Sequence, residues 1–123
     1  MFDSTVFIDA LRGIEKAKSY LFSSSTLRTS RIVIMELVAG SDSLISLKKN
    51  LKFIADLGLE VYEISEKDSI LAGKLFESYY LKYGLGITDA LIAAMAVNKN
   101  EGLVTHNIKH FKFITGLEVV KPY

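Results

Sequence analysis

Apolar residues along the chain form short runs, which alternate with longer segments in which they recur every three or four positions. The short runs predict strands over residues 1–3, 26–30, 59–64, 102–105 and 117–121. The longer segments predict helices over residues 4–12, 14–23, 31–39, 44–57, 65–83 and from 88 onward. Because strands and helices alternate, we expect an α/β fold with a mainly parallel sheet.

Polar residues mark the expected starts of several helices. Ser65 and Asp68, three positions apart, form a capping-box pattern. Ser30 is the expected cap of the helix that follows it, although the β-branched residues of 31–38 also fit a strand. Thr88 is the expected cap of a later helix rich in alanine, which predicts close packing of that helix on the sheet.

Segment 44–57 has the pattern of an amphipathic helix. We expect its apolar residues to face inward, namely Leu44, Leu47, Leu51, Ile54 and Leu57. The outward face would carry Lys48, Lys49 and Lys52. Two interpretations of these lysines remain open, a solvated face and a contact with nucleic acid.

Composition narrows the class of protein. The 123 residues predict one domain over 1–123, with a balance of apolar and charged residues typical of a globular chain. A net charge of +1 provides no global field for a nucleic-acid partner. The absence of cysteine excludes disulfides and thiolate metal sites. No apolar run is long enough for a membrane span and no secretory signal is expected, so we expect a cytoplasmic protein.

A carboxylate stands at the end of the first apolar run. Asp3 follows Met1 and Phe2 directly, and Ser4 or Thr5 is the expected cap of the next helix. Ligands of open α/β sheets bind at the carboxyl ends of the strands. A carboxylate near the core must be paired, hydrogen-bonded or bound to a metal. Asp3 is therefore a candidate site residue.

Three further polar residues are predicted near the same edge of the sheet. Glu36 lies past the first turn of the helix after the second strand, Asp89 begins the alanine-rich helix, and Asn107 lies in the turn after the fourth strand. Parallel strands bring their carboxyl ends to one edge, so we expect Asp3 and these three residues to converge. For Asp89 alone, a carboxylate that stabilises the helix dipole is the competing interpretation.

A cluster of three carboxylates would favour the binding of a divalent cation. Without a countercharge the groups repel one another, and at least one pKa rises. Carboxylate oxygens suit Mg²⁺ or Mn²⁺, whereas neither His106 nor His110 belongs to a zinc-binding spacing. Such ions activate water and stabilise the leaving oxygen of a phosphodiester. The cluster therefore predicts metal-dependent phosphodiester hydrolysis.

Four segments in register carry a family resemblance. They are Asp3–Asp9, Ser30–Gly40, Gly86–Ala94 and Leu103–Phe111, followed by Leu117–Val120 near the end of the chain. Together they resemble a PIN-domain protein, most closely the VapC-type toxin ribonucleases of toxin–antitoxin pairs. The resemblance covers essentially the whole chain.

This resemblance implies a three-layer α/β/α sandwich with a central, mainly parallel sheet and an acidic pocket for Mg²⁺ or Mn²⁺. The family's three invariant acids match Asp3, Glu36 and Asp89, which would then be the catalytic and metal-binding residues. Thr5 and Thr105 would be polar supports of the pocket.

The family commonly carries a fourth acid at or just after the position of Asn107, or at that of His110, and this chain has no carboxylate at either. Asn107 remains a candidate catalytic residue, since an amide oxygen can bind Mg²⁺ or its water without adding charge. The resemblance also implies an RNA substrate, a cognate antitoxin protein and a homodimer.

Two other interpretations compete with this one. An aspartyl-phosphate mechanism at Asp3 would need a second Asp two residues later, where the chain has Thr5. A PIN-like domain that binds RNA or a partner with weak or no catalysis is the stronger alternative, because Asn107 replaces the fourth acid.

Overall fold

The computed structural model describes residues 1–123 as seven helices and four short strands. The helices are α1 (Ser4–Leu11), α2 (Glu15–Ser23), α3 (Arg31–Ala39), α4 (Leu44–Asp56), α5 (Glu66–Tyr83), α6 (Ile87–Asn98) and α7 (Ile108–Phe111). The strands are β1 (Arg28–Ser30), β2 (Glu60–Tyr62), β3 (Leu103–Val104) and β4 (Val119–Val120). The order of elements agrees with the prediction, but every strand is shorter than expected.

Phe2 joins the strands into one sheet. β1 pairs with β2 and β3 pairs with β4, both in parallel. Phe2 forms parallel bridges with Thr29 of β1 and Val104 of β3, so the order across the sheet is β2, β1, Phe2, β3, β4. The expected first strand is thus a single bridged residue at the centre. This placement confirms the predicted parallel sheet.

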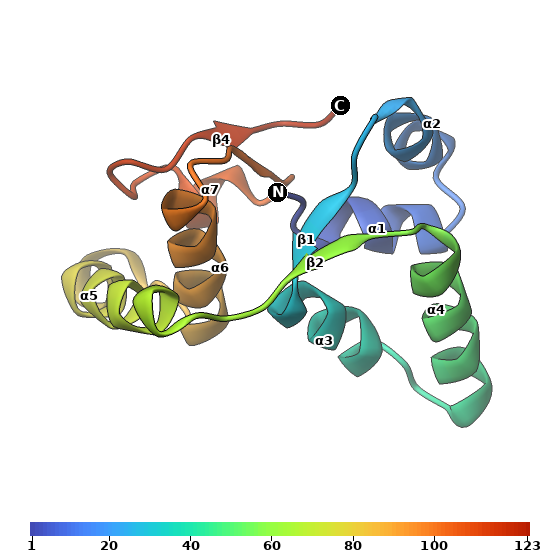
Figure 1. Ribbon diagram of the computed structural model, residues 1–123, viewed down its shortest axis with the longest axis horizontal. Helices are drawn as coiled ribbons and strands as arrows, with labels where there is room; N and C mark the ends of the chain where they lie inside the picture. Colours follow the sequence, from blue (N-terminus) through green and yellow to red (C-terminus); the bar gives the residue numbers. More distant parts are fainter.

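The helices form groups on either side of the strands. Figure 1 shows α1, α2 and α4 to one side of β1 and β2, with α5, α6 and α7 to the other. α5 packs mainly against α6, while α3 contacts both α1 and α6 and so joins the two groups. None of these helices is both long and apolar enough to cross a membrane.

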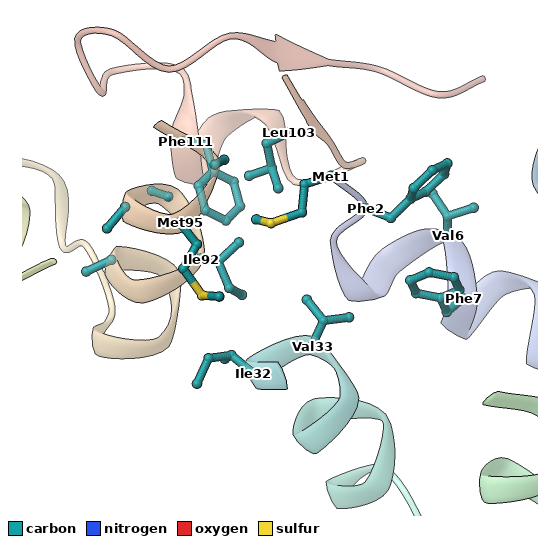
Figure 2. Close-up of a cluster of buried hydrophobic side chains, with 14 of the residues drawn as sticks. Met1, Phe2, Val6, Phe7, Ile32, Val33, Ile92, Met95, Leu103 and Phe111 are labelled. Carbon is teal, nitrogen blue, oxygen red and sulfur yellow. The ribbon is translucent and has the colours of Figure 1, made fainter. Parts of the chain in front are cut away.

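The hydrophobic core lies on both faces of the central bridge. Figure 2 shows Met1 directed toward Ile92 and Met95 of α6, whereas Phe2 turns toward α1. The ring of Phe2 lies 5.8 Å from that of Phe7. Side chains of an extended segment point alternately to opposite faces, so Met1 and Phe2 each complete a different half of the core. Asp3 comes next and is also buried.

Two of the predicted helix starts are confirmed. The Ser30 hydroxyl accepts a hydrogen bond from the backbone N–H of Val33, which makes Ser30 the cap of α3. At the start of α5, Ser65 and Asp68 each accept a hydrogen bond from the other's backbone N–H. Such caps satisfy backbone donors that the first helical turn leaves free.

Two other predicted starts are wrong. Asp3, not Ser4 or Thr5, is the N-terminal flanking residue of α1, and its side chain makes no capping hydrogen bond. α6 begins before Thr88, because Gly86 takes the extended N-cap conformation and its carbonyl accepts from Ala90 N–H at 2.9 Å. Asp89 is consequently the third residue of α6, within its first turn.

The predicted orientation of segment 44–57 is only partly correct. Leu44 and Leu51 are 66% and 47% exposed, and no residue of α4 is fully buried. Ile54 and Leu57 do pack against the core, but from its margin. The reason is the position of α4 at the edge of the molecule, where it packs chiefly against α3 (Figure 1). Amphipathic spacing predicts that a helix has an apolar face, but it does not predict how much of that face other elements bury.

Candidate active site

Asp3 lies at the carboxyl end of the central bridge and is 3% exposed. The backbone on both sides fixes its place. Phe2 N–H donates to Arg28 O at 2.7 Å, and Asp3 N–H donates to Val104 O at 2.9 Å. The Asp3 carboxylate is therefore positioned by sheet hydrogen bonds to two segments distant in sequence.

Thr105 is the hydrogen-bond partner of this buried carboxylate. Its hydroxyl donates to Oδ2 of Asp3 at 2.6 Å and accepts the backbone N–H of Asn107 at 3.0 Å. Thr105 is itself fully buried, at the end of β3. A hydroxyl has one proton and can also accept, so Thr105 connects Asp3 to the start of α7.

Thr5 supports the same region through the backbone. Its hydroxyl oxygen accepts the backbone N–H of His106 at 3.1 Å. The first turn of α1 is thereby tied to the loop between β3 and α7. Thr5 thus holds the loop that carries Asn107 and makes no hydrogen bond to the carboxylates.

Glu36 reaches the site from α3. Its Oε2 atom is buried and has no hydrogen-bond partner. Burial raises the pKa of the Glu36 carboxyl, and the negative charges of Asp3 and Asp89 raise it further, against the effect of the Ser4 hydroxyl. An unpartnered carboxylate oxygen among other carboxylates is unfavourable unless a cation or proton compensates it.

Asp89 reaches the site from the first turn of α6. Burial raises the pKa of its carboxyl, as does the charge of Asp3, whereas His110 acts in the opposite direction. The Nδ1 atom of His110 lies 3.5 Å from Oδ2 of Asp89. Asp89 therefore interacts with a carboxylate on one side and an imidazole on the other.

The structure brings Asp3, Glu36 and Asp89 close enough for their charges to act on one another. The side chains do not form a ready chelate, since no three acidic or histidine groups surround a common point at ligand distance. The donor chemistry nevertheless fits a hard divalent cation, which would compensate the repulsion and give the buried Oε2 of Glu36 a partner. Carboxylates, with no cysteine and no histidine pair, favour Mg²⁺ or Mn²⁺ over zinc.

Asn107 is placed differently from the three acids. Its backbone flanks the start of α7 and donates to Thr105, but its exposed side chain makes no hydrogen bond. The structure therefore puts Asn107 on the loop beside the acids without a side-chain contact to them.

Two hollows open next to the acids. One of about 350 Å³ includes Asp89 and His110, between the start of α6 and α7. The other, of about 260 Å³, includes Glu36 and Arg12, between α1, α3 and α4. The sequence did not single out Arg12, and position 110 was expected at the pocket only as one where the family commonly carries a fourth acid. Neither basic residue lies near its acid in sequence, so spacing along the chain gave no signal for these contacts.

A second polar cluster also escaped sequence analysis. The hydroxyl of Tyr123 donates to Oδ2 of Asp9 at 2.9 Å, and its ring meets His106 edge-on, with 4.4 Å between ring centres. Burial and Asp9 raise the pKa of Tyr123 to about 12. These contacts hold the segment after β4 against α1. No periodic pattern links residues 9, 106 and 123, so the cluster had no sequence signal.

Comparisons with known proteins agree with this geometry. A PIN domain family model matches residues 1–114. Ribonuclease VapC1 of Rickettsia felis is 30% identical over 124 residues, which cover 96% of this chain and 92% of that protein.

Two solved structures are also similar. In a toxin–antitoxin complex from Klebsiella pneumoniae, the similar chain is 28% identical with a TM-score of 0.78, and the match covers 99% of this chain and 96% of that one. The second is VapBC2 from Rickettsia felis bound to a DNA fragment from their promoter. The similar chain is 28% identical with a TM-score of 0.75, and the match covers 97% of this chain and 95% of that one. These matches confirm the predicted three-layer α/β/α fold. The chain belongs to the PIN-domain family and is of the VapC type.

Proposed function

We propose that this protein is a Mg²⁺- or Mn²⁺-dependent endoribonuclease and the toxin of a toxin–antitoxin pair. The observation that carries the proposal is the meeting of Asp3, Glu36 and Asp89 at the carboxyl edge of the sheet, where Glu36 is half-buried with an unpartnered Oε2 atom and the charge of Asp3 acts on both other carboxyls. Support also comes from the similarity to Ribonuclease VapC1.

Each side chain has a distinct part in the proposed mechanism. The carboxylates of Asp3, Glu36 and Asp89 hold the cation, and Asn107 offers a neutral amide oxygen beside them. When bound, the cation supplies Lewis-acid chemistry that favours ionisation of water and stabilises charge on a phosphodiester. Thr105 keeps the Asp3 carboxylate in place by donating to Oδ2 at 2.6 Å.

His110 limits the freedom of Asp89. With Nδ1 at 3.5 Å from Oδ2, the imidazole orients that carboxylate and lowers its pKa against the effect of burial. The buried backbone around Asp3 excludes water from the inner side of the site, so substrate approaches from the two hollows.

The proposed partners follow from the relatives. Similar chains occur in toxin–antitoxin complexes from Klebsiella pneumoniae and Rickettsia felis. A small antitoxin protein is therefore the proposed regulator of this chain. We also propose that this chain forms a homodimer and is located in the cytoplasm. RNA is the proposed substrate.

Cleavage of a mixed RNA pool tests the proposal. The purified protein should produce fragments with Mn²⁺ or Mg²⁺ and none with EDTA. Because water attacks in the proposed reaction, the fragments should carry no 2′,3′-cyclic phosphate. Cyclic phosphate ends or cleavage in EDTA would indicate a contaminating ribonuclease, and intact RNA in all conditions would favour a domain that binds without cutting.

A further inference from the structure

The hollow beside Asp89 has the features of a binding site for a substrate backbone. It has a volume of about 350 Å³ and is lined by Tyr83, the turn 84–86, Asp89, Lys109 and His110. Asp89 is shared with the acidic centre, so whatever enters this hollow lies next to the proposed site of cleavage.

The basic side chains of this hollow stand on its exposed side. Lys109 and His110 are consecutive residues of α7, and both are exposed. The Nζ atom of Lys82 lies 5.3 Å from the centre of the Tyr83 ring and adds positive charge at the rim. Asp89 is the only acid among the lining residues. An anionic group can therefore contact cations here while its neighbour faces the acidic centre.

Aromatic stacking and a glycine turn shape the part of the hollow that Tyr83 and residues 84–86 line. The ring of Tyr83 stacks on Phe113, with 4.3 Å between ring centres and an interplanar angle of 3°. Gly84 ends α5 with φ +66, a conformation that favours glycine. At Gly86 a Cβ atom would lie 4.0 Å from Oδ2 of Asp89, so the backbone of this turn passes close to that carboxylate.

We propose that this hollow binds a phosphodiester of single-stranded RNA next to the scissile one, with Lys109 as its principal contact. The inference rests on the proposed ribonuclease function and adds a substrate subsite to it. A single strand fits better than a duplex, because its backbone can bend into a small hollow beside a buried carboxylate. Lysine binds phosphate as a point charge and needs no fixed orientation.

The other lysines of the chain provide a contrast. Lys112 follows α7 and is exposed, but it does not line the hollow. Lys52 on α4 is paired with Asp56 at 2.9 Å. Lys109 and Lys112 are thus close in sequence and equal in charge but differ in access to Asp89. The variants Lys109→Gln and Lys112→Gln remove the same charge, and only the first alters the hollow.

The test measures RNA binding separately from cleavage. Fluorescence anisotropy of a labelled, mixed-sequence single-stranded RNA is followed in EDTA over a series of salt concentrations, for wild type and both variants. Each phosphate contact on a single strand contributes about 0.7 to the slope of log affinity against log salt. Lys109→Gln should lower that slope by about 0.7 and weaken binding at low salt, while Lys112→Gln should leave the slope unchanged.

The results distinguish a failure of the subsite proposal from a failure of the nuclease proposal. Equal slopes for the two variants, or no binding by wild type, would overturn the subsite even if the protein cuts RNA with Mn²⁺. A lower slope for Lys109→Gln alone, in a protein that never cuts RNA, would uphold the subsite and refute the nuclease function. Circular dichroism of both variants checks that each retains the wild-type fold.

Discussion

The Thr105 hydroxyl donates a hydrogen bond of 2.6 Å to the Asp3 carboxylate, although the two residues lie 102 positions apart in sequence. Both side chains are buried, and Thr105 also accepts the backbone N–H of Asn107. This contact connects the central bridge of the sheet to the loop before α7. It explains how a carboxylate can be held inside the fold in a fixed orientation.

Replacing Thr105 with valine should therefore destabilise the protein. The change keeps the shape of the side chain but leaves a buried carboxylate oxygen and a backbone N–H without their partner, at a cost of about 1–3 kcal/mol. Urea unfolding in EDTA measures the loss. Thr105→Ser retains the hydroxyl and should recover most of the stability, whereas equal loss in both variants would show that packing of the methyl group matters more.

Asp89→Asn should have opposite effects on stability and activity. Neutralising Asp89 relieves its repulsion by Asp3, so the melting temperature of the metal-free protein should rise by a few degrees, where about 1 kcal/mol corresponds to about 3–5 °C for a chain of this length. Metal-dependent cleavage should disappear. A lower melting temperature in EDTA would mean that the favourable position of Asp89 in the first turn of α6 outweighs the repulsion.

Glu36→Gln should make stability less dependent on pH. The native pKa of Glu36 lies above its ordinary value of 4.5, so the native state binds more protons than the unfolded state between these two values. Ionised Glu36 therefore opposes folding above the native pKa, and this penalty declines as pH falls through the native pKa toward 4.5. In EDTA, the stability advantage of the glutamine variant over wild type should be largest at neutral pH and shrink toward pH 4.5.

Unfolding in urea at a series of pH values measures this difference. An advantage that stays constant from neutral pH to pH 4.5 would show that Glu36 has an ordinary pKa in the native state. The exposed variant Glu77→Gln is the matched control, and its stability relative to wild type should not follow the same trend.

Asn107→Asp should maintain or increase the affinity for Mn²⁺. One added charge near a bound cation is worth about 1 kcal/mol in a solvated setting, or about fivefold in Kd. Calorimetric titration with Mn²⁺ measures the change. Asn100→Asp makes the same charge change at the far end of α6 and should have no effect. Weaker binding by Asn107→Asp would exclude Asn107 from the metal pocket.

The sequence indicated the acids because each follows a recognisable local pattern. Asp3 ends an apolar run, Glu36 follows the Ser30 cap, and Asp89 precedes an alanine-rich buried segment. Local patterns determine where strands end, and parallel pairing then brings those ends together. This is why the convergence of the three acids could be expected before the fold was known.

The features that escaped prediction depend on tertiary placement. The contact of His110 with Asp89 and the exposure of Leu44 follow from how helices are positioned, which helical spacing does not encode. The misplaced cap of α6 has a local cause, because Gly86 takes over a role for which Thr88 has the better side chain. A helix begins where backbone conformation permits, and side-chain preference is a weaker influence.

Mn²⁺-dependent RNA cleavage by wild type, Asp3→Asn and Asp89→Asn, purified in parallel, shows most directly whether these carboxylates form the active site. Asp56→Asn serves as the control, since Asp56 is exposed, pairs with Lys52 and has no part in the proposed site. We expect full activity for wild type and the control, and a loss of at least about 100-fold in both acid variants. Undiminished cleavage by Asp3→Asn and Asp89→Asn would contradict the central claim that these carboxylates form the active site.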